Sequence, residues 1–301
     1  MSAGSVPTTR IVSARSSVWA HIRAVWEFRE LLVLLTRTQL KVKYKNSALG
    51  FFWSMLNPAL YLVVYYIVFQ VILGSGIPDF AIFLLSGLLI WNLFSTALPG
   101  AAGAMVGSSA IVKKVNLPRE ILVLAPVGAA LIHFFLQTVV LLGALILFQH
   151  NIGWGYVWLL PIALAVLLLF TAGLGIFLSA VNVYLRDTMH FLELLLLAWF
   201  WMTPIVYPYR LIADKGGWAA VLYKLNPILW IVLPFQRAIY NEPEPTVVKN
   251  GVVTTTHILP ADVGPLWYLG RIAVVGVISV IVTLLAIKYF ARVEGNIAEE
   301  L

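Results

Sequence analysis

The stretch YVWLLPIALAVLLLFTAGLGIFLSAVN occupies residues 156–182 and contains no Asp, Glu, Lys or Arg. A helix rises about 1.5 Å per residue, so roughly 20 apolar residues cross the ~30 Å hydrocarbon core of a bilayer. This stretch is therefore long enough to span a membrane with some tilt. Its Pro161, Gly173 and Gly175 are compatible with a span, because neighbouring helices in a bundle satisfy the backbone groups that such residues disturb.

Five further apolar stretches predict an all-α integral membrane protein with six transmembrane helices. They lie at 58–77, 80–99, 121–148, 189–207 and 266–288. The 301 residues are 61% hydrophobic and 11% charged, with a mean hydropathy of +0.93. Soluble domains are about 45–50% apolar and about 25% charged, so a water-soluble enzyme is excluded. The chain has no Cys, which excludes disulfides and thiolate sites.

The distribution of Lys and Arg predicts the orientation of the spans. Eight of these residues precede the first span, and the short loops after spans 1 and 3 have none. Six more lie in the loops after spans 2 and 4 and near the C-terminus: Lys113, Lys114, Arg119, Arg186, Lys288 and Arg292. The positive-inside rule therefore places both termini in the cytoplasm of a multi-pass protein of the inner or plasma membrane.

Three parts of the chain follow from this orientation. We expect a cytoplasmic arm at 1–57, a six-span domain at 58–290 and a cytoplasmic tail at 291–301. Residues 1–17 are polar and do not have the pattern of a signal peptide.

Residues 18–45 have helical spacing and predict an amphipathic helix in the membrane interface. Arg23, Glu27 and Glu30 form a polar stripe at i, i+4 and i+7, and Trp26 belongs to the apolar residues largely opposite. Basic residues near the end of this segment suit the headgroup region. The alternative is a helix that packs against the bundle.

The segment 208–262 between the last two expected spans alternates apolar turns with breaks. Pro208, Pro227 and Pro234 interrupt it, and a polar stretch follows from Asn241 to Thr256. Irregular backbone at membrane depth must be buried in protein or line a wet cavity. We therefore expect a helical hairpin that dips partly into the outer leaflet, followed at 241–256 by a mobile outer loop.

The chain has no recognisable motif for energy conversion or catalysis. It lacks a phosphate-binding G-x-x-x-x-G-K-[ST] loop, an H-E-x-x-H zinc motif and a G-x-S-x-G nucleophile elbow, and its five His are scattered. Ion-coupled transporters usually have ionisable residues inside the membrane. Glu193 is the only acid well inside an apolar run, so the sequence gives little support for this class. We expect no catalytic residue, no metal and no cofactor on this chain. Driven transport would then need a partner chain that binds ATP and Mg²⁺.

Four segments, in this order, resemble the ABC-2-type exporter permeases of cell-surface polysaccharides. They are RTQLKVKYKNSALGFFWSMLNPAL (37–60), VNLPREILVLAP (115–126), VNVYLRDTMHFLELLLLAWFWMTPIVYP (181–208) and LNP (225–227). The family includes the membrane subunits of O-antigen, teichoic acid and actinobacterial galactan exporters, and the galactan exporters are the most similar. The resemblance implies a homodimer of twelve spans with two copies of a P-loop ATPase. Such an assembly exports a polyprenyl-diphosphate-linked glycan.

The resemblance also implies where this chain contacts its partners. A coupling helix that docks on the ATPase belongs in the loop at 102–120, with Ser108, Ser109, Ile111, Val112, Lys113 and Lys114. The outer gate helices of the family correspond to 208–262. The gate candidates there and just before it are Tyr207, Tyr209, Trp218 and Trp230. A plain cytoplasmic loop is the alternative for 102–120.

Candidates for contact with the glycan lipid come in two chemical types. Lys41, Lys43, Lys45 and Arg119 are cations that suit a lipid diphosphate, with general anchoring to anionic lipid as the alternative. The aromatic candidates for lining a glycan channel are Tyr61, Tyr65, Phe69, Trp91, Trp199 and Trp201. The first three form one helical stripe, and aromatic rings offer flat faces to sugars, although aromatic belts at the membrane interface are the alternative.

Two other functions stay open at this point. One is an ABC-2 permease for a small lipid or drug, which shares the architecture. The other is a polytopic polyprenyl-sugar transferase, which would need catalytic groups in its outer loop. The acids there are Asp214, Glu242, Glu244 and Asp262, and their spacing matches no catalytic arrangement.

Overall fold

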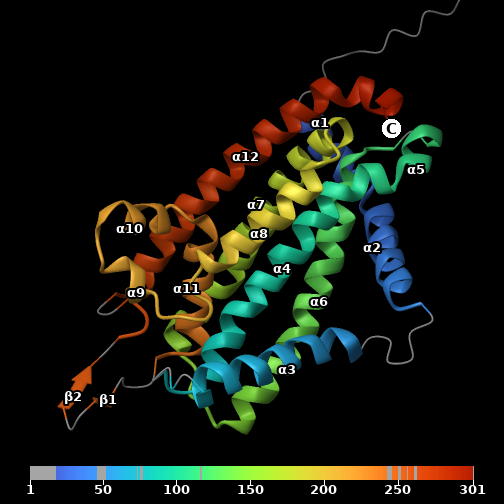
Figure 1. Cartoon of the computed structure of the whole chain (residues 1–301). Helices are drawn as coiled ribbons and strands as arrows, with labels where there is room; N and C mark the ends of the chain where they lie inside the picture. The colour runs from blue at the N-terminus through green and yellow to red at the C-terminus, as the bar shows by residue number, and fades with distance from the viewer. Residues whose placement is uncertain are drawn as a thin grey trace, which may run out of the picture.

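A computed structural model describes residues 18–45, 52–72, 74, 77–115, 117–242, 246–249, 252–255, 257–260 and 263–300. Four long helices form a bundle (Figure 1). They are α4 (Phe80–Gly107), α6 (Glu120–Leu147), α7 (Leu159–Tyr184) and α12 (Pro265–Glu300). All four are long and apolar enough to cross a membrane, α12 over Pro265–Val293. The expectation of an all-α membrane protein is confirmed for this bundle.

Helix α4 forms the centre of the bundle. It packs against α6 and α7, and α12 packs against the far side of α7. In the apolar part of α4, 83% of the residues are buried, against 28% in α6 and in α12. Glycine permits the close approach of α4 and α7, since a Cβ on Gly175 would lie 2.6 Å from the Cβ of Ala101.

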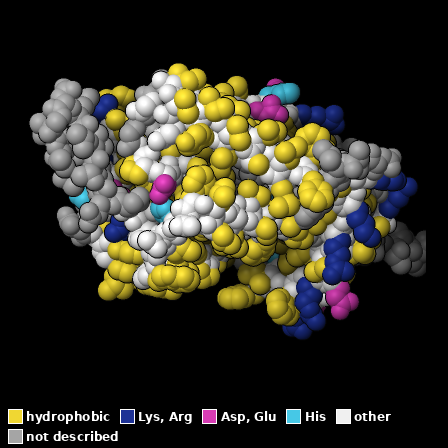
Figure 2. Space-filling view, turned by 90° about the horizontal axis from the view of Figure 1, so that it is seen from below, with side chains coloured by type: hydrophobic (Ala, Val, Ile, Leu, Met, Phe, Trp, Pro, Cys, Tyr) yellow, Lys and Arg dark blue, Asp and Glu magenta, His cyan; other side chains and the backbone are white. Residues whose placement is uncertain are grey.

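The outer helices present apolar side chains outward. Val139 and Ile146 of α6 and Val277 and Leu285 of α12 are exposed. Hydrophobic side chains cover most of the face in Figure 2, and most of the visible Lys and Arg lie along one side of it. An apolar surface of this extent suits contact with lipid chains.

Six full-length spans are not confirmed in the described residues. The expected first span, 58–77, overlaps α3 (Trp53–Tyr65) and includes the π-helix η2 (Tyr66–Ile72), and the expected fifth, 189–207, overlaps α8 (Thr188–Trp201). The 14 residues of α8 cover about 21 Å, short of a ~30 Å hydrocarbon core. Helix α8 ends just before Pro204, which disfavours helical backbone at the residue before it. In Figure 1, α3 crosses the long helices instead of running beside them.

The N-terminal arm forms two helices where the sequence analysis expected one. Helix α1 (Val18–Glu27) and helix α2 (Arg29–Tyr44) are separated at Phe28. Helix α2 packs along α6, where the Thr36 hydroxyl donates to the Ala125 carbonyl oxygen at 3.4 Å. Helix α2 thus contacts the bundle, and the position of residues 18–45 in the membrane interface stays a prediction. Residues 1–17 lie outside the described residues.

Short elements complete the chain at the two ends of the bundle. They are α5 (Ser109–Lys114), η3 (Trp154–Tyr156), α9 (Arg210–Ala213), α10 (Gly217–Lys224), α11 (Pro227–Ile239), β1 (Thr246–Lys249) and β2 (Val252–Thr255). We call the end with α5 the α5 end and the end with β1 and β2 the hairpin end. Helices α10 and α11 meet at 76°, as in a broken span or a re-entrant hairpin.

The strands β1 and β2 form an antiparallel ribbon that pairs Thr246 with Thr255 and Lys249 with Val252. The sequence analysis expected a mobile outer loop at 241–256. The sequence does carry a hairpin signal, because an Asn-Gly pair at 250–251 separates two β-branched runs.

Candidate functional site

A polar pocket of about 290 Å³ lies where α2, α3, α4 and α6 meet. Its polar lining includes Lys43, Tyr61, Asn92, His133 and Gln137. Asn92 and His133 lie near the midpoints of the 28-residue helices α4 and α6. Polar side chains at mid-membrane depth are costly and typically mark a pathway for ions or substrates. We call this site the midspan pocket.

Hydrogen bonds hold the walls of the midspan pocket in place. The Asn92 side-chain amide donates to Gln137 Oε1 at 3.3 Å and joins α4 to α6. The Tyr44 hydroxyl lies 3.2 Å from His133 Nδ1 and fixes the end of α2 against α6. The sequence analysis missed Asn92, His133 and Gln137. Their signal was present, because each is a polar residue inside a long apolar run.

The predicted aromatic stripe forms as the spacing indicated, with Tyr61 and Tyr65 on α3 and Phe69 on η2. The ring centres of Tyr61 and Tyr65 are 6.3 Å apart, and those of Tyr65 and Phe69 are 6.0 Å apart. A second pocket, also of about 290 Å³, is lined by Tyr61, Tyr65, Trp91 and Asn92 and by residues of α8. The two pockets are adjacent, because both are lined by Tyr61, Asn92 and Ser95. We call the two pockets together the α3 groove.

The other three aromatic channel candidates, Phe69, Trp199 and Trp201, do not line the α3 groove. The Trp199 indole N–H donates to Asn226 Oδ1 at 2.7 Å, and its ring packs on Phe94 with ring centres 5.1 Å apart. Trp199 is thus part of the interior packing. Trp201 is 53% exposed and contacts Phe200.

The four cationic candidates do not form one cluster. Lys41 and Lys43 lie on α2, Lys45 directly follows it, and Arg119 precedes α6 at the α5 end. Helix α2 runs along α6 toward His133, about 21 Å beyond Arg119 at 1.5 Å per residue. Lys43 therefore lines the midspan pocket, and Arg119 lies at the end of the bundle.

Helix α5 presents the predicted coupling residues at the end of the bundle. Val112 is buried and anchors α5, and Ile111, Lys113 and Lys114 are exposed. Ser108 directly precedes the helix, and Ser109 begins it. This arrangement leaves an apolar side chain and two cations free to meet a partner.

The predicted interface residues lie on an exposed face of α1 and at the start of α2. Arg23 Nε and Glu27 Oε1 form an exposed ion pair at 2.9 Å, and Glu30 is exposed in the first turn of α2. Trp26 is 70% exposed. Such an exposed ring suits the headgroup layer of a membrane.

A buried pair at the α5 end was not predicted. His21 Nδ1 lies 2.5 Å from Glu120 Oε1, and both residues are buried. This contact joins α1 to the first turn of α6, directly after the segment that carries α5. A residue separation of 99 explains why sequence spacing did not reveal it.

The predicted gate residues gather on one side of α10 and α11, with one exception. The Tyr209 ring lies 5.8 Å from Tyr223 and 6.3 Å from Trp230 between centres. The Tyr207 hydroxyl donates to the Trp201 carbonyl oxygen at 2.7 Å. Trp218 is 80% exposed and lies apart from this cluster.

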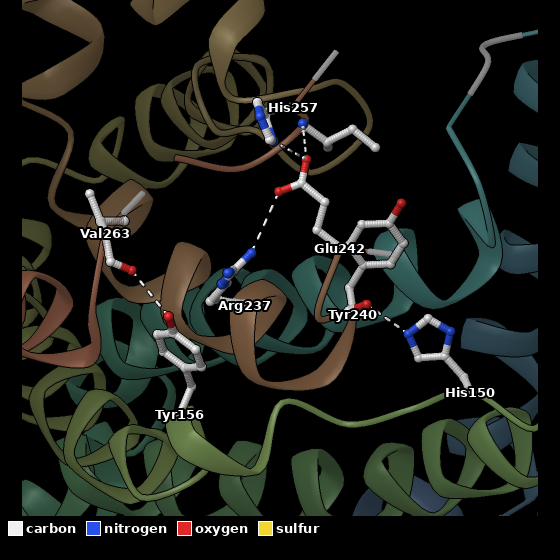
Figure 3. Close-up of polar contacts among 8 residues, drawn as sticks. His150, Tyr156, Arg237, Tyr240, Glu242, His257 and Val263 are labelled. Atoms are coloured by element: carbon white, nitrogen blue, oxygen red, sulfur yellow. Dashed lines mark hydrogen bonds and ion pairs between the residues drawn. The ribbon is translucent and has the colours of Figure 1, made fainter. Parts of the chain in front are cut away.

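Glu242 connects the two ends of the segment that holds β1 and β2 (Figure 3). Its Oε2 lies 3.5 Å from a guanidinium nitrogen of Arg237, and its Oε1 lies 3.8 Å from His257 Nδ1. The Ile258 backbone N–H also donates to Oε1. A buried carboxylate that accepts several donors is held firmly, so Glu242 fixes the base of this segment.

His150 joins three elements at the hairpin end. Its Nδ1 lies 2.9 Å from Asp79 Oδ2, just before α4. Its Nε2 lies 2.7 Å from the Tyr240 carbonyl oxygen at the end of α11, a contact marked in Figure 3. A carboxylate and a carbonyl oxygen only accept hydrogen bonds. His150 therefore makes both contacts when both ring nitrogens carry a proton.

The bundle of four helices that are each long and apolar enough to cross a bilayer defines a multi-pass membrane protein. The chain belongs to the ABC-2 type transporter family, whose pattern matches residues 30–240. It is a transport component rather than a catalytic chain. The resemblance drawn from the sequence is confirmed.

Curated relatives agree with this family. The O-antigen export system permease protein RfbA of Myxococcus xanthus is 33% identical over 254 residues, which cover 84% of this chain and 91% of that one. An RfbA protein of Klebsiella pneumoniae is 30% identical over 212 residues, 70% of this chain and 81% of that one. The polysialic acid transport protein KpsM of Escherichia coli is 22% identical over 228 residues, which cover 71% and 81% of the two chains.

Proposed function

We propose that this chain is the transmembrane subunit of an ATP-driven exporter of a polyprenyl-diphosphate-linked polysaccharide. The α3 groove carries the proposal, because it combines a cation with a row of aromatic rings. Lys43 suits the diphosphate, and Tyr61, Tyr65 and Trp91 offer flat faces to sugar rings. The relatives named for O-antigen export and polysialic acid transport support a polysaccharide as substrate. The likeness to galactan exporters favours a galactan.

The proposed working unit is a dimer of this chain with two P-loop ATPase subunits. ATP and Mg²⁺ bind to the ATPase, which supplies the energy. The excess of Lys and Arg around the α5 end favours a cytoplasmic position for this end, by the positive-inside rule. Helices α1 and α12 bring both terminal regions to the same end (Figure 1). The glycan lipid would enter the permease from the cytoplasmic side of the inner membrane. It would leave on the opposite side, at the hairpin end.

Reconstitution tests this function directly. In proteoliposomes that hold this chain, its ATPase partner and a lipid-linked glycan, we expect glycan to cross the bilayer only when ATP is hydrolysed. Transport by the chain without the ATPase would contradict the proposal. Transport of small lipids or drugs with no glycan transport would favour the other kind of ABC-2 permease. Extension or transfer of the sugar would favour a transferase.

The exposed apolar residue of α5 provides a test of coupling. Ile111→Asp leaves Val112 in its buried site but places a charge where α5 would meet the ATPase. We expect at least a tenfold loss of ATPase co-purification and of ATP-driven transport, because an unpaired charge is costly in an interface. Leu185→Asp is the matched control, since Leu185 is exposed at the same end between α7 and α8. Equal losses in both variants would remove α5 as the coupling element.

A further inference from the structure

A second groove lies between α7 and α12 and shares no lining residue with the α3 groove. Its volume is about 420 Å³. Leu174, Phe177 and Leu285 are among its apolar lining residues, and Lys288 and Arg292 are its cations. Phe177 is 40% and Leu285 61% exposed, so the apolar floor is open to the surroundings of the bundle.

The packing of α7 and α12 explains why a groove forms here. The two helices touch at Gly173, where a Cβ would lie 2.5 Å from Thr283 Oγ1 and 3.0 Å from its backbone. One turn further along α7, the bulky rings of Phe177 and Tyr289 meet with their centres 5.4 Å apart. Gly173 allows α7 and α12 to touch, whereas one turn later the rings of Phe177 and Tyr289 keep the two helices further apart. The groove therefore opens from the close contact toward the α5 end.

The groove is apolar at one end and cationic at the other. Lys288 and Arg292 are four residues apart and share one face of α12. Both are exposed, and no carboxylate pairs with either among the side chains that the structure describes. From Val282, at the apolar end, to Arg292 the helix rises about 15 Å. Most of this length lies beside apolar side chains, and the cations follow toward the α5 end.

We propose that this groove binds one anionic phospholipid. Its phosphate lies between Lys288 and Arg292, and an acyl chain lies along Leu174, Phe177 and Leu285. Basic pockets between membrane helices on the positively charged side of a protein recognise anionic headgroups in this way. Because the groove is separate from the α3 groove, this lipid is a bound partner of the permease and not its transported substrate.

Native mass spectrometry of the purified full chain with its ATPase partner tests the site, with phosphatidylglycerol and phosphatidylcholine as probes. The double variant K288Q/R292Q should bind phosphatidylglycerol about 30-fold more weakly, since two cations at the headgroup are lost. Binding of phosphatidylcholine should stay unchanged. The control R37Q/R186Q makes the same change of charge at two exposed residues that line neither groove, and it should retain phosphatidylglycerol. Equal affinity for the two lipids in the unsubstituted chain, or equal losses in both double variants, would overturn the proposal.

Two substitutions at Leu285 test the proposal further. One tests whether an acyl chain lies in the groove, and the other tests whether a second copy of the chain occupies it. Leu285→Trp fills the apolar floor and keeps both cations, and it should also weaken phosphatidylglycerol binding. Unchanged binding in L285W would mean that no acyl chain lies in the groove. The chain has no Cys, so Leu285→Cys introduces a single thiol. A disulfide-linked dimer of L285C would assign the groove to a second copy of the chain and overturn the lipid proposal.

Discussion

Export of the lipid-linked glycan should fall by about 10- to 100-fold when Lys43 is replaced by Ala, while the permease still assembles with its ATPase. The proposed role of Lys43 is a charge-assisted hydrogen bond to the diphosphate within the midspan pocket. Hydrogen bonds to charged groups contribute about 1.5–3 kcal/mol, which corresponds to this range of effects. Replacement of all four cationic candidates, Lys41, Lys43, Lys45 and Arg119, should block export.

Lys41→Ala is the matched control for this prediction. Lys41 is an exposed cation on α2, as Lys43 is, but it does not line the pocket. We expect export by this variant to stay within about twofold of the unsubstituted protein, because a surface cation contributes little. Glycan retained inside cells and ATPase co-purification are the two measurements. Equal effects at both positions would indicate general lipid anchoring and would remove Lys43 from the proposed path.

Local sequence pattern predicted the four long helices because apolarity and length are local properties. It overestimated the length of α8 for a related reason. The residues after Trp201 are still apolar, but Pro204 and the turn before it end the helix. Hydropathy measures the apolar run, whereas the span depends on how much of that run is helical.

Sequence pattern failed where a contact joins distant segments. Asn92 and Gln137 are 45 residues apart, and His21 and Glu120 are 99 apart. Nothing in their spacing shows that they meet, since the pairing depends on how α1, α4 and α6 pack. The polar wall of the midspan pocket is a tertiary feature for this reason. The aromatic stripe of Tyr61, Tyr65 and Phe69 was predictable because it repeats every four residues along α3 and the directly following η2.

The short segment LNP at 225–227 carried part of the family resemblance, and the structure gives a physical reason for it. Asn226 is buried and caps α11, with Oδ1 accepting from the Ile228 backbone N–H at 3.0 Å. Pro227 occupies the first turn of α11, where a missing N–H costs nothing. Asn226 also accepts from the Trp199 indole N–H and donates to the Met202 carbonyl oxygen at 3.1 Å. One side chain thus joins the end of α8 to the start of α11.

Asn226→Ala should lower the apparent melting temperature of the purified permease by about 4–16 °C. The variant loses a helix cap, worth about 1 kcal/mol, and leaves the Trp199 indole N–H without its partner, which costs a further 1–3 kcal/mol. About 2–4 °C per kcal/mol converts this loss into the expected shift. The control is Asn151→Ala, because Asn151 is an exposed residue at the hairpin end, and its shift should stay below about 1 °C.

A second substitution tests the cause of this destabilisation. Trp199→Phe removes the indole donor, so in the Asn226→Ala background it should recover part of the lost stability. Asn226→Ser keeps a hydroxyl that can cap α11. Its side chain is too short to replace the contacts of the Asn226 amide with Trp199 and Met202. The melting temperature of this variant should therefore lie between those of Asn226→Ala and the unsubstituted chain. If Trp199→Phe destabilised the Asn226→Ala chain further, the unpaired indole would not be the source of the loss. The junction of α8 and α11 would then depend on ring packing of Trp199 against Phe94 and not on the hydrogen bonds of Asn226.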